Sequence, residues 1–416
     1  MSYCLRTRGI DHLVLESERA CHTWQSQRWR TFSLVTPNWQ CRLPGMPYGG
    51  DDPDGFMVRD EIVEYLSVYR DLVDPPLVEG VTATRLRRDA RGSFEVTTTA
   101  GTVTADQLVV ATGGYHEPII PRFAERLPAE LTQITAAEYT HPGDLPDGEV
   151  LVVGSGQSGA QIAEDLHLAG RTVHLSVGSA PRVARFYRGR VVTAWLDDMG
   201  YYDMPVQEHP RQEAVRAQAN HYVTGRDGGR DIDLRAFARY GMRLYGRLAG
   251  FDGDGGGTLR FAPDLTRNLN HADEVSESIK DTIDKHISRH GIDAPQQERY
   301  SPVWTPPEDP VALQLTATAI TSVVWCIGFR SDFRWIDLPV FTGSGYPSHE
   351  RGVTSAQGLY FLGLPWLYTW GSGRFSGVGR DAEYLADRIR EHRRVFSPTS
   401  YSNARGDMCN VLALGS

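Results

Sequence analysis

The sequence contains little cysteine, and the cysteines it has are scattered. Its 416 residues include five, none in a C-x-x-C pair or at the spacing of metal ligands. This scarcity argues against a disulfide framework, a zinc centre and a redox-active dithiol, and it fits a reducing compartment. The five are Cys4, Cys21, Cys41, Cys326 and Cys409.

The sequence also lacks a basic excess and a long apolar run. It holds 43 Lys and Arg against 52 Asp and Glu, for a net charge of -9, whereas nucleic-acid-binding proteins carry a basic face. No segment reaches the roughly 20 apolar residues that cross a bilayer, and the N-terminus lacks a signal-peptide pattern. We therefore expect a cytoplasmic protein that acts on a small molecule, with no nucleic-acid or membrane partner, and we leave homo-oligomerisation open.

The best-specified motif that the sequence does contain lies in residues 149–178. Residues 150–153 form an apolar run typical of a buried parallel strand, and Gly154, Gly156 and Gly159 follow at G-x-G-x-x-G spacing. A helical pattern and a second apolar strand, 173–177, come next. The glycines allow a tight turn, the approach of a pyrophosphate to the backbone, and close packing of helix on strand. This order of elements predicts a dinucleotide site.

The end of the second strand favours NADPH over NADH. An acidic residue there would bind the ribose hydroxyl group and repel a 2′-phosphate, but the position is Ser176. Four arginines follow, which suit a phosphate group, although surface arginines on a solvated loop would give the same pattern. They are Arg182, Arg185, Arg188 and Arg190.

The start of the chain resembles the second half of a strand, glycine loop, helix and strand unit like that of residues 149–178. A helical segment ends at Gly9, a short strand covers 13–15, and Glu16 stands where Ser176 stands in the internal unit. Glu16 is therefore the expected ribose-binding acid. The separation between Gly154 and Ser176 in the internal unit, counted back from Glu16, places the missing glycines immediately before Met1. The sequence thus predicts that a central strand and its phosphate loop are absent, which would leave apolar faces of the sheet exposed.

Two more segments, "ADQLVVATGGYHEP" and "ITSVVWCIGFRSDF", are apolar strands that end in a small-residue turn. Together with "WQSQRWRTFSLVTPNWQCRLPG", "GFMVRDEIVEYL", "VVGSGQSGAQIAEDL" and "GLYFLGLPWLYTWGSG", they resemble the flavin-containing monooxygenase-like family, whose members bind two dinucleotides. The resemblance covers residues 1 to about 390. It extends to bacterial flavoproteins found beside nitrilase genes.

This resemblance implies FAD on the first unit and NADPH on the second. The positions that match the family toward FAD are Glu16, Trp24, Ala111, Thr112, Gly113 and Gly363. Those that match it toward NADPH are Gly154, Gly156, Gln157, Ser158, Gly159 and Ser176, with Arg182 as the phosphate partner.

The chain departs from the family in two places. The first G-x-G-x-x-G is absent, and the F-x-G-x-x-x-H signature is not matched, since Thr135 stands where its histidine is expected. Either the natural chain begins earlier, which we favour, or the protein is N-terminally truncated and binds FAD weakly. The intact pattern downstream of the break supports the first alternative.

The order of elements predicts an α/β fold with two Rossmann-like dinucleotide-binding domains, the second inserted in the first. We expect an FAD domain from residues 1–147 and 301–390, an NADPH domain from 148–300 with an insertion at 197–300, and a loosely ordered tail at 391–416.

The predicted function is an FAD-dependent, NADPH-using oxidoreductase that acts as a monooxygenase on a small organic substrate. One alternative is a flavin-dependent reductase or dehydrogenase with a non-oxygen acceptor, and another is a truncated nucleotide-binding protein with little activity. The sequence names no catalytic side chain. Asn38 is a candidate, although a turn residue after Pro37 explains it equally well. We expect no metal site, and we interpret His286 and His290 as polar-face residues before a helix-ending Gly291.

Overall fold

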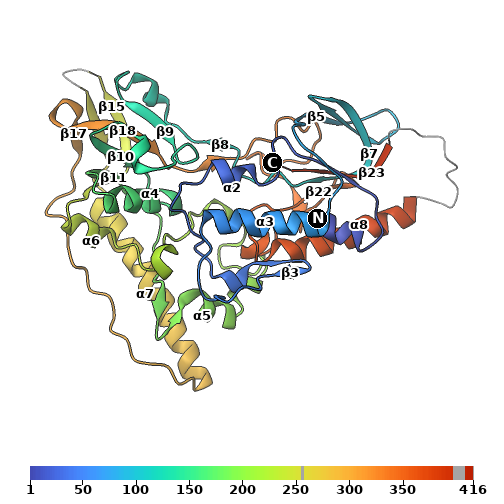
Figure 1. Ribbon diagram of the computed structural model, residues 1–416. Coiled ribbons are helices and arrows are strands. Elements are labelled where there is room, and N and C mark those ends of the chain that lie inside the picture. The colour runs from blue at the N-terminus through green and yellow to red at the C-terminus, as the bar shows by residue number, and fades with distance from the viewer. Residues whose placement is uncertain (254–256, 397–407, 416) are drawn as a thin grey trace.

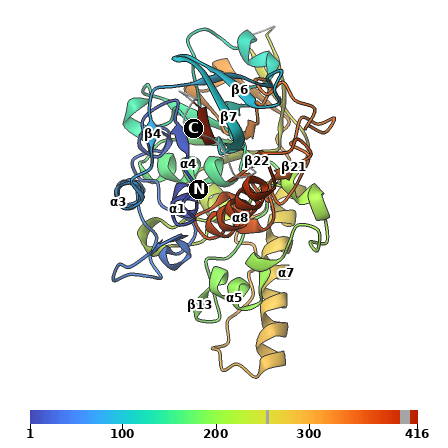
Figure 2. The same cartoon turned by 90° about the vertical axis from the view of Figure 1, so that its right-hand side faces the viewer.

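The computed structural model describes residues 1–253, 257–396 and 408–415. Two sheets with parallel centres lie at opposite ends of an elongated molecule (Figure 1). A long helix, α7 (Leu265–His290), extends away from both sheets, as the two views show (Figures 1 and 2). The mixed α/β architecture confirms the predicted fold class.

The larger sheet has nine strands and follows the order β20-β21-β22-β7-β23-β1-β4, with β5 and β6 added in antiparallel pairing beside β7. Its parallel centre comprises β22, β7, β23, β1 and β4. The strands are β1 (Leu13–Leu15), β4 (Leu77–Val78), β5 (Ala83–Arg88), β6 (Phe94–Thr98), β7 (Gly101–Val110), β20 (His349–Glu350), β21 (Val353–Thr354), β22 (Leu359–Phe361) and β23 (Met408–Leu414).

Strand β23, from the C-terminal end of the chain, occupies the centre of this sheet. It pairs in parallel with β7 on one side and with β1 on the other. Residues 411–414 are buried, so their apolar side chains contribute to both faces of the sheet. The prediction that the sheet lacks its central strand is therefore wrong.

The predicted loose tail at 391–416 is corrected by the same observation. Helix α8 (Val378–Phe396) continues through the first part of this segment, and residues 408–414 form β23. Residues 397–407 and 416 lie outside the described part of the chain. A run of apolar residues gains more from burial between two strands than from exposure to water, which explains the ordered strand.

Helices cover the larger sheet. Helix α1 (Ser2–Arg6) and α8 pack on one face, where Leu5, Val109, Leu385 and Ala413 belong to a single buried cluster. The short α1 begins near the carboxyl end of β23, and both chain ends lie in the same region of the molecule in the two views (Figures 1 and 2). Helix α3 (Arg59–Val73) lies between β1 and β4 in the chain, and its Ile62 is fully buried.

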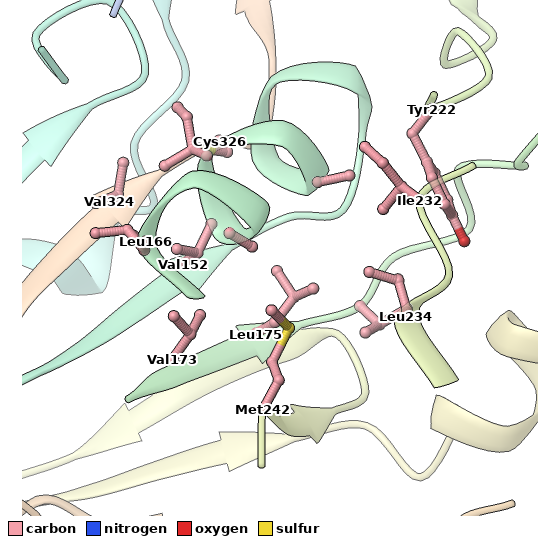
Figure 3. Close-up of a cluster of buried hydrophobic side chains, with 14 of the residues drawn as sticks. Val152, Leu166, Val173, Leu175, Tyr222, Ile232, Leu234, Met242, Val324 and Cys326 are labelled. Carbon is pink, nitrogen blue, oxygen red and sulfur yellow. The ribbon is translucent and has the colours of Figure 1, made fainter. Parts of the chain in front are cut away.

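The second sheet has five parallel strands in the order β14-β11-β10-β18-β9. Helix α4 (Gln157–Leu168) packs on it, and Figure 3 shows the side chains between them, among them Val152, Leu166, Leu175 and Cys326. The strands are β9 (Thr132–Thr135), β10 (Glu149–Val153), β11 (Val173–Ser176), β14 (Arg243–Tyr245) and β18 (Ile320–Trp325).

This sheet corrects two sequence-based assignments. The segments 132–135 and 320–325 were expected in the first domain, but β9 and β18 lie in the second sheet, with β18 hydrogen-bonded between β10 and β9. Both strands are short, and nothing local in a short strand says which sheet it joins.

The remaining elements connect and cover the two sheets. Helix α7 ends at Gly291 with a φ of 61°, which confirms the predicted helix end. The other helices are α2 (His22–Ser26), α5 (Val192–Asp198) and α6 (Leu234–Arg239). The other strands are β2 (Arg42–Leu43), β3 (Met46–Pro47), β8 (Glu117–Pro118), β12 (Phe186–Tyr187), β13 (Arg190–Val191), β15 (Leu248–Asp252), β16 (Thr258–Phe261), β17 (Ala312–Gln314) and β19 (Phe329–Arg330).

Within the described ranges, no helix is both long and apolar enough to cross a membrane. The same ranges contain no group of three or more His, Cys, Asp or Glu side chains arranged to hold a metal ion.

Candidate dinucleotide-binding sites

The glycine loop after β10 has the geometry that its spacing predicts. Gly154 adopts a φ of 104°, which favours glycine, and a side chain at Gly159 would lie 1.9 Å from the Gly154 carbonyl oxygen. A side chain at Gly156 would meet no atom within 4 Å. The first and third glycines therefore serve the turn and the packing of α4, while the second faces open space, as the approach of a pyrophosphate requires.

The residues that follow the loop lie in the first turn of α4. Gln157 and Ser158 begin this 12-residue helix, whose N-terminal N–H groups are suited to an anion. The Gln157 side chain donates a hydrogen bond of 2.6 Å to the Val223 carbonyl oxygen. Ser155 accepts a hydrogen bond of 3.0 Å from the Gly178 N–H and so ties the loop to the chain just after β11. The loop is thus held from two sides.

Ser176 lies at the end of β11 but is directed into the protein. Its hydroxyl group donates to the Gly246 carbonyl oxygen at 3.0 Å and accepts from the Leu248 N–H at 2.9 Å. The side chain is buried, so it positions the turn between β14 and β15. This environment differs from the one predicted for a ribose contact.

Arg182 is also buried, in contrast to the phosphate-binding role predicted for it. Its guanidinium group lies 2.7 Å from the Asp273 carboxylate and 3.9 Å from the centre of the Tyr300 ring. Burial acts to lower the pKa of Arg182, whereas the Asp273 carboxylate acts to raise it. The net effect is a pKa above the ordinary value. The burial of this guanidinium group and its ion pair with Asp273 do not support the phosphate-binding role predicted for Arg182.

The three arginines that follow Arg182 are engaged as well. Arg185 is buried and donates to the carbonyl oxygens of Val35 and Thr224. Arg188 pairs with Asp284 at 2.9 Å, and Arg190 with Asp198 at 2.6 Å. Partners distant in sequence hold Arg185 and Arg188, whereas the partner of Arg190 lies eight positions further along the chain.

The structure places two other arginines beside the end of β11. A cavity of about 800 Å³ opens at Ser179, three residues beyond the strand, and Arg247 and Arg267 line it. Both guanidinium groups contact the buried carboxylate of Asp264, at 2.7 and 3.2 Å. Although burial acts to raise it, the pKa of Asp264 is lowered by its hydrogen bonds with Arg247 and by the charge of Arg267. The negative charge of Asp264 holds both guanidinium groups in place. The sequence analysis did not identify these two arginines because they lie far from the glycine loop in the sequence.

The other cavity walls carry both charge signs. Glu274 and His271 lie on α7, and Asp309 accepts hydrogen bonds from the main chain and hydroxyl group of Thr266 at 3.0 and 2.6 Å. The residues that line the cavity are all of polar or charged types, so their heads can bind a hydroxylated, charged ligand group.

In the larger sheet, Glu16 follows the end of β1, as predicted. Its carboxylate accepts hydrogen bonds from the Glu18 N–H at 3.2 Å and from the Ser17 hydroxyl group at 3.3 Å. Burial raises the pKa of Glu16 above its ordinary value, against these hydrogen bonds. A side chain at Gly415 would lie 2.7 Å from the Glu16 carboxylate, so the end of β23 passes directly beside this acid.

The turn after β7 lies at the same edge of the sheet. The Ala111 N–H donates to the Leu414 carbonyl oxygen at 2.8 Å, and the Thr112 carbonyl oxygen lies 3.1 Å from the His116 ring. Gly113 and Gly363 both have positive φ, 71° and 82°, and face open space. The turn after β7 and the turn after β22 therefore leave room at the carboxyl ends of the strands, where α/β sheets bind their ligands.

The carboxyl edges of the two sheets face one another. Tyr115, just after the β7 turn, contacts the ring of Phe329, which follows β18, at 6.0 Å between centroids. Ser331 donates a hydrogen bond of 2.8 Å to the Gly114 carbonyl oxygen. Trp24, from α2, lies between the rings of Phe32 and Phe375. Groups from both nucleotide-binding units therefore meet at one junction.

Asn38 does not have the free amide group that a catalytic role would need. It is buried, its amide nitrogen donates to the Asp52 carbonyl oxygen at 3.0 Å, and its amide oxygen accepts from the Met57 N–H at 2.7 Å. Both ends of the side chain support the loop around residues 52–57. The structure thus favours the turn interpretation of Asn38 and gives it no role in chemistry.

Comparison with known proteins identifies the class to which this geometry belongs. A family model described as pyridine nucleotide-disulphide oxidoreductase matches residues 1–224. An uncharacterized CzcO-like oxidoreductase of Geobacillus kaustophilus is 31% identical over 395 residues, which cover 94% of this chain and 95% of that protein. Indole-3-pyruvate monooxygenase YUCCA6 of Arabidopsis thaliana is 31% identical over 189 residues, 43% of this chain and 45% of that protein.

Solved structures agree on the fold. A flavin-containing monooxygenase from Stenotrophomonas maltophilia gives a TM-score of 0.56 at 17% identity, over 93% of this chain and 99% of that one. The cadaverine monooxygenase DfoA from Erwinia amylovora, solved with FAD, gives a TM-score of 0.59 at 14% identity, over 98% and 96%. Two facing nucleotide-binding units of this kind define a flavin-dependent oxidoreductase. More particularly, the chain belongs to the pyridine nucleotide-disulphide oxidoreductase family, and its relatives include flavin-containing monooxygenases.

Proposed function

We propose that this protein is an FAD-dependent, NADPH-using monooxygenase of a small organic substrate. The observation that carries the proposal is the junction between the two sheets, where the segments after β7 and β18 contact each other and the turn after β22 lies beside Gly114. Two nucleotides seated on the two units would bring their reactive rings to this junction. Reduced flavin in such a place would supply the electrons for oxygen activation.

The first unit has the features that FAD requires. Glu16 presents a carboxylate at the end of β1 for an adenosine ribose, and the backbone of β23 ends beside it. Gly113 and Gly363 keep the sheet edge free of side chains. Trp24 and the turn of Ala111 and Thr112 would line the flavin ring and shield it from water.

The second unit has the features that NADPH requires. The Gly154–Gly159 loop and the N-terminus of α4 would hold the pyrophosphate. In place of Arg182 and Ser176, we assign the 2′-phosphate to Arg247 and Arg267, because both line the cavity that opens beyond β11. Their shared Asp264 would keep the guanidinium groups in position in the absence of ligand.

A flavin-dependent reductase with a non-oxygen acceptor is the competing function. A dithiol version of it is disfavoured, since the four cysteines whose side chains are described are unpaired, and Cys4, Cys41 and Cys326 are buried. Burial raises the pKa of Cys41 to about 12, which suppresses the reactive thiolate.

Oxygen uptake separates the two functions. The full chain, incubated with excess FAD and freed of unbound flavin, is mixed with NADPH in an oxygen electrode. We expect one oxygen consumed per NADPH oxidised. Oxidation of NADPH that needs an added electron acceptor, with no oxygen consumed, would favour the reductase instead.

A further inference from the structure

Residues 29–35, the linking segment, belong to the first unit but reach into the second. The segment lies between β1 and α3 in the chain, yet Trp29 is buried in the cluster of side chains that packs the second sheet. The Trp29 ring lies 6.3 Å from that of Tyr139, which follows β9. Because protein interiors are close-packed, the burial of Trp29 fixes the linking segment against the second unit.

The first unit holds one side of the linking segment. The Leu34 N–H donates to the Met57 carbonyl oxygen at 2.9 Å. The Phe32 carbonyl oxygen accepts from the Arg59 N–H at 2.9 Å, so the segment is tied to the start of α3. The Phe32 ring also lies 6.0 Å from that of Trp24, for which we propose contact with the flavin ring.

Asp165 of α4 holds the opposite side of the linking segment. It is 3% exposed, and its carboxylate accepts hydrogen bonds from three side chains of distant segments. The donors are the hydroxyl groups of Thr31 and Tyr139, at 2.6 and 2.7 Å, and the guanidinium group of Arg226, at 2.8 Å. Of these three donors, Thr31 is the one that belongs to the first unit. Its bond therefore connects the linking segment to the helix to which we assign the NADPH pyrophosphate.

Arg185 fixes the far end of the linking segment. Its buried guanidinium group donates to the Val35 carbonyl oxygen at 2.7 Å and to the Thr224 carbonyl oxygen at 2.8 and 3.0 Å. A side chain at Gly225 would lie 2.0 Å from the Leu34 carbonyl oxygen, so the two backbones are in direct contact there. The second unit thus holds both ends of the linking segment as well as Thr31 near its middle.

We propose that Thr31 and Asp165 are positioning residues that set how closely the FAD site approaches the NADPH site. This inference rests on the proposed function, in which a hydride passes from NADPH to FAD, so that NADPH is oxidised to NADP⁺ and FAD is reduced by two electrons. Such a transfer requires reacting atoms about 3 to 3.5 Å apart, and a displacement of about 1 Å can slow it by about 100-fold. The path from Trp24 through the linking segment and the Thr31–Asp165 bond to α4 joins the two sites.

Two variants that each remove one hydrogen bond to the same carboxylate test the proposal. Thr31→Val removes the donor of the first unit and keeps the shape of the side chain, whereas Tyr139→Phe removes a donor of the second unit and keeps the ring beside Trp29. Both should lower the melting temperature by similar amounts, because each leaves Asp165 with two of these three donors. Thr31→Ser keeps the hydroxyl group and should behave as the unchanged chain does.

The rate at which NADPH reduces bound FAD without oxygen separates these variants. We expect Thr31→Val to slow this reduction by at least about 10-fold at saturating NADPH. The NADPH concentration that gives half the maximal rate should stay unchanged, since the glycine loop and the start of α4 are intact. Tyr139→Phe and Thr31→Ser should retain the rate of the unchanged chain. Equal rates for Thr31→Val and Tyr139→Phe would show that Thr31 has a structural role alone and would overturn the proposal.

Hydrogen–deuterium exchange of the full chain, measured without added nucleotide, gives a second readout. Thr31→Val should speed the exchange of amide hydrogens in the linking segment at least about 10-fold, whereas Tyr139→Phe should leave that exchange unchanged. Equal exchange of the linking segment in Thr31→Val and in the unchanged chain would contradict the proposal. Failure of the unchanged chain to bind FAD, or of NADPH to reduce it, contradicts the proposed function instead. The exchange measurement then still decides whether the Thr31–Asp165 bond holds the linking segment.

Discussion

Leu15 and Leu414 lie side by side at the carboxyl ends of two parallel strands, although 399 positions separate them in the sequence. Leu414 also pairs in parallel with Val110 of β7. The C-terminal strand thus joins the segment of Glu16, for which we propose ribose binding, to the turn after β7. In the first nucleotide-binding unit, this strand takes the central place that β10 takes in the second unit.

The first prediction tests the structural importance of β23. Leu412 is fully buried between β1 and β7, so Leu412→Ala should lower the free energy of unfolding by about 2 to 5 kcal/mol. Urea unfolding followed by circular dichroism measures the change. Val303→Ala, at a position that is 45% exposed, should change it by less than about 0.5 kcal/mol. Equal effects of the two variants would show that β23 is not a central strand in solution.

The second prediction concerns the glycine loop. Gly159→Ala places a carbon 1.9 Å from the Gly154 carbonyl oxygen, whereas Gly156→Ala meets no protein atom. We therefore expect Gly159→Ala to lower the melting temperature and Gly156→Ala to leave it nearly unchanged while raising the KM for NADPH. Differential scanning calorimetry and steady-state kinetics distinguish the effects. A Gly156→Ala variant with unaltered KM would show that no ligand approaches this glycine.

The third prediction concerns coenzyme choice. Arg247→Gln and Arg267→Gln should each raise the KM for NADPH by about 10-fold and leave the KM for NADH almost unchanged, since only NADPH carries the 2′-phosphate. Arg182→Gln should instead destabilise the fold, because it leaves Asp273 with one arginine partner fewer. If Arg182→Gln changes the NADPH to NADH ratio and the other two variants do not, our assignment of the phosphate site is wrong.

The fourth prediction concerns pH. Burial, aided by neighbouring His271, lowers the pKa of His221 to about 4. The unfolded chain takes up a proton near pH 6.5 and the folded chain does not, so this group lowers stability as pH falls from about 6.5 to 4. The slope should approach 1.4 kcal/mol per pH unit in that window. His221→Gln should lower this slope by up to the contribution of one proton, measured by urea unfolding at several pH values. An unchanged slope would contradict a half-buried His221 that stays neutral in the folded chain.

Local patterns in the sequence predicted the elements that short stretches of chain determine. The strand at 13–15, the glycine loop after β10, the strand 173–177 to within one residue and the end of α7 at Gly291 all follow from apolar periodicity and glycine placement. Each of these features depends on residues within a few turns of one another.

Features that depend on distant partners were missed. The run at 411–414 resembles any short apolar strand, and its role became visible only from its pairing with β1 and β7. Arg182 was predicted to be free to bind a phosphate because its partner Asp273 lies 91 positions away in the sequence. Arg247 and Arg267 are brought together by their shared contact with Asp264. Sequence position alone does not reveal which charges an ion pair has already neutralised.

Anaerobic reduction is the measurement that tests the central claim most directly. The FAD-loaded chain is mixed with NADPH in a stopped-flow spectrophotometer without oxygen, and the visible absorbance of the oxidised flavin is followed. Our account predicts that the absorbance bleaches with NADPH and returns when air is admitted. A chain that binds no FAD, or bound FAD that NADPH does not bleach, would contradict it.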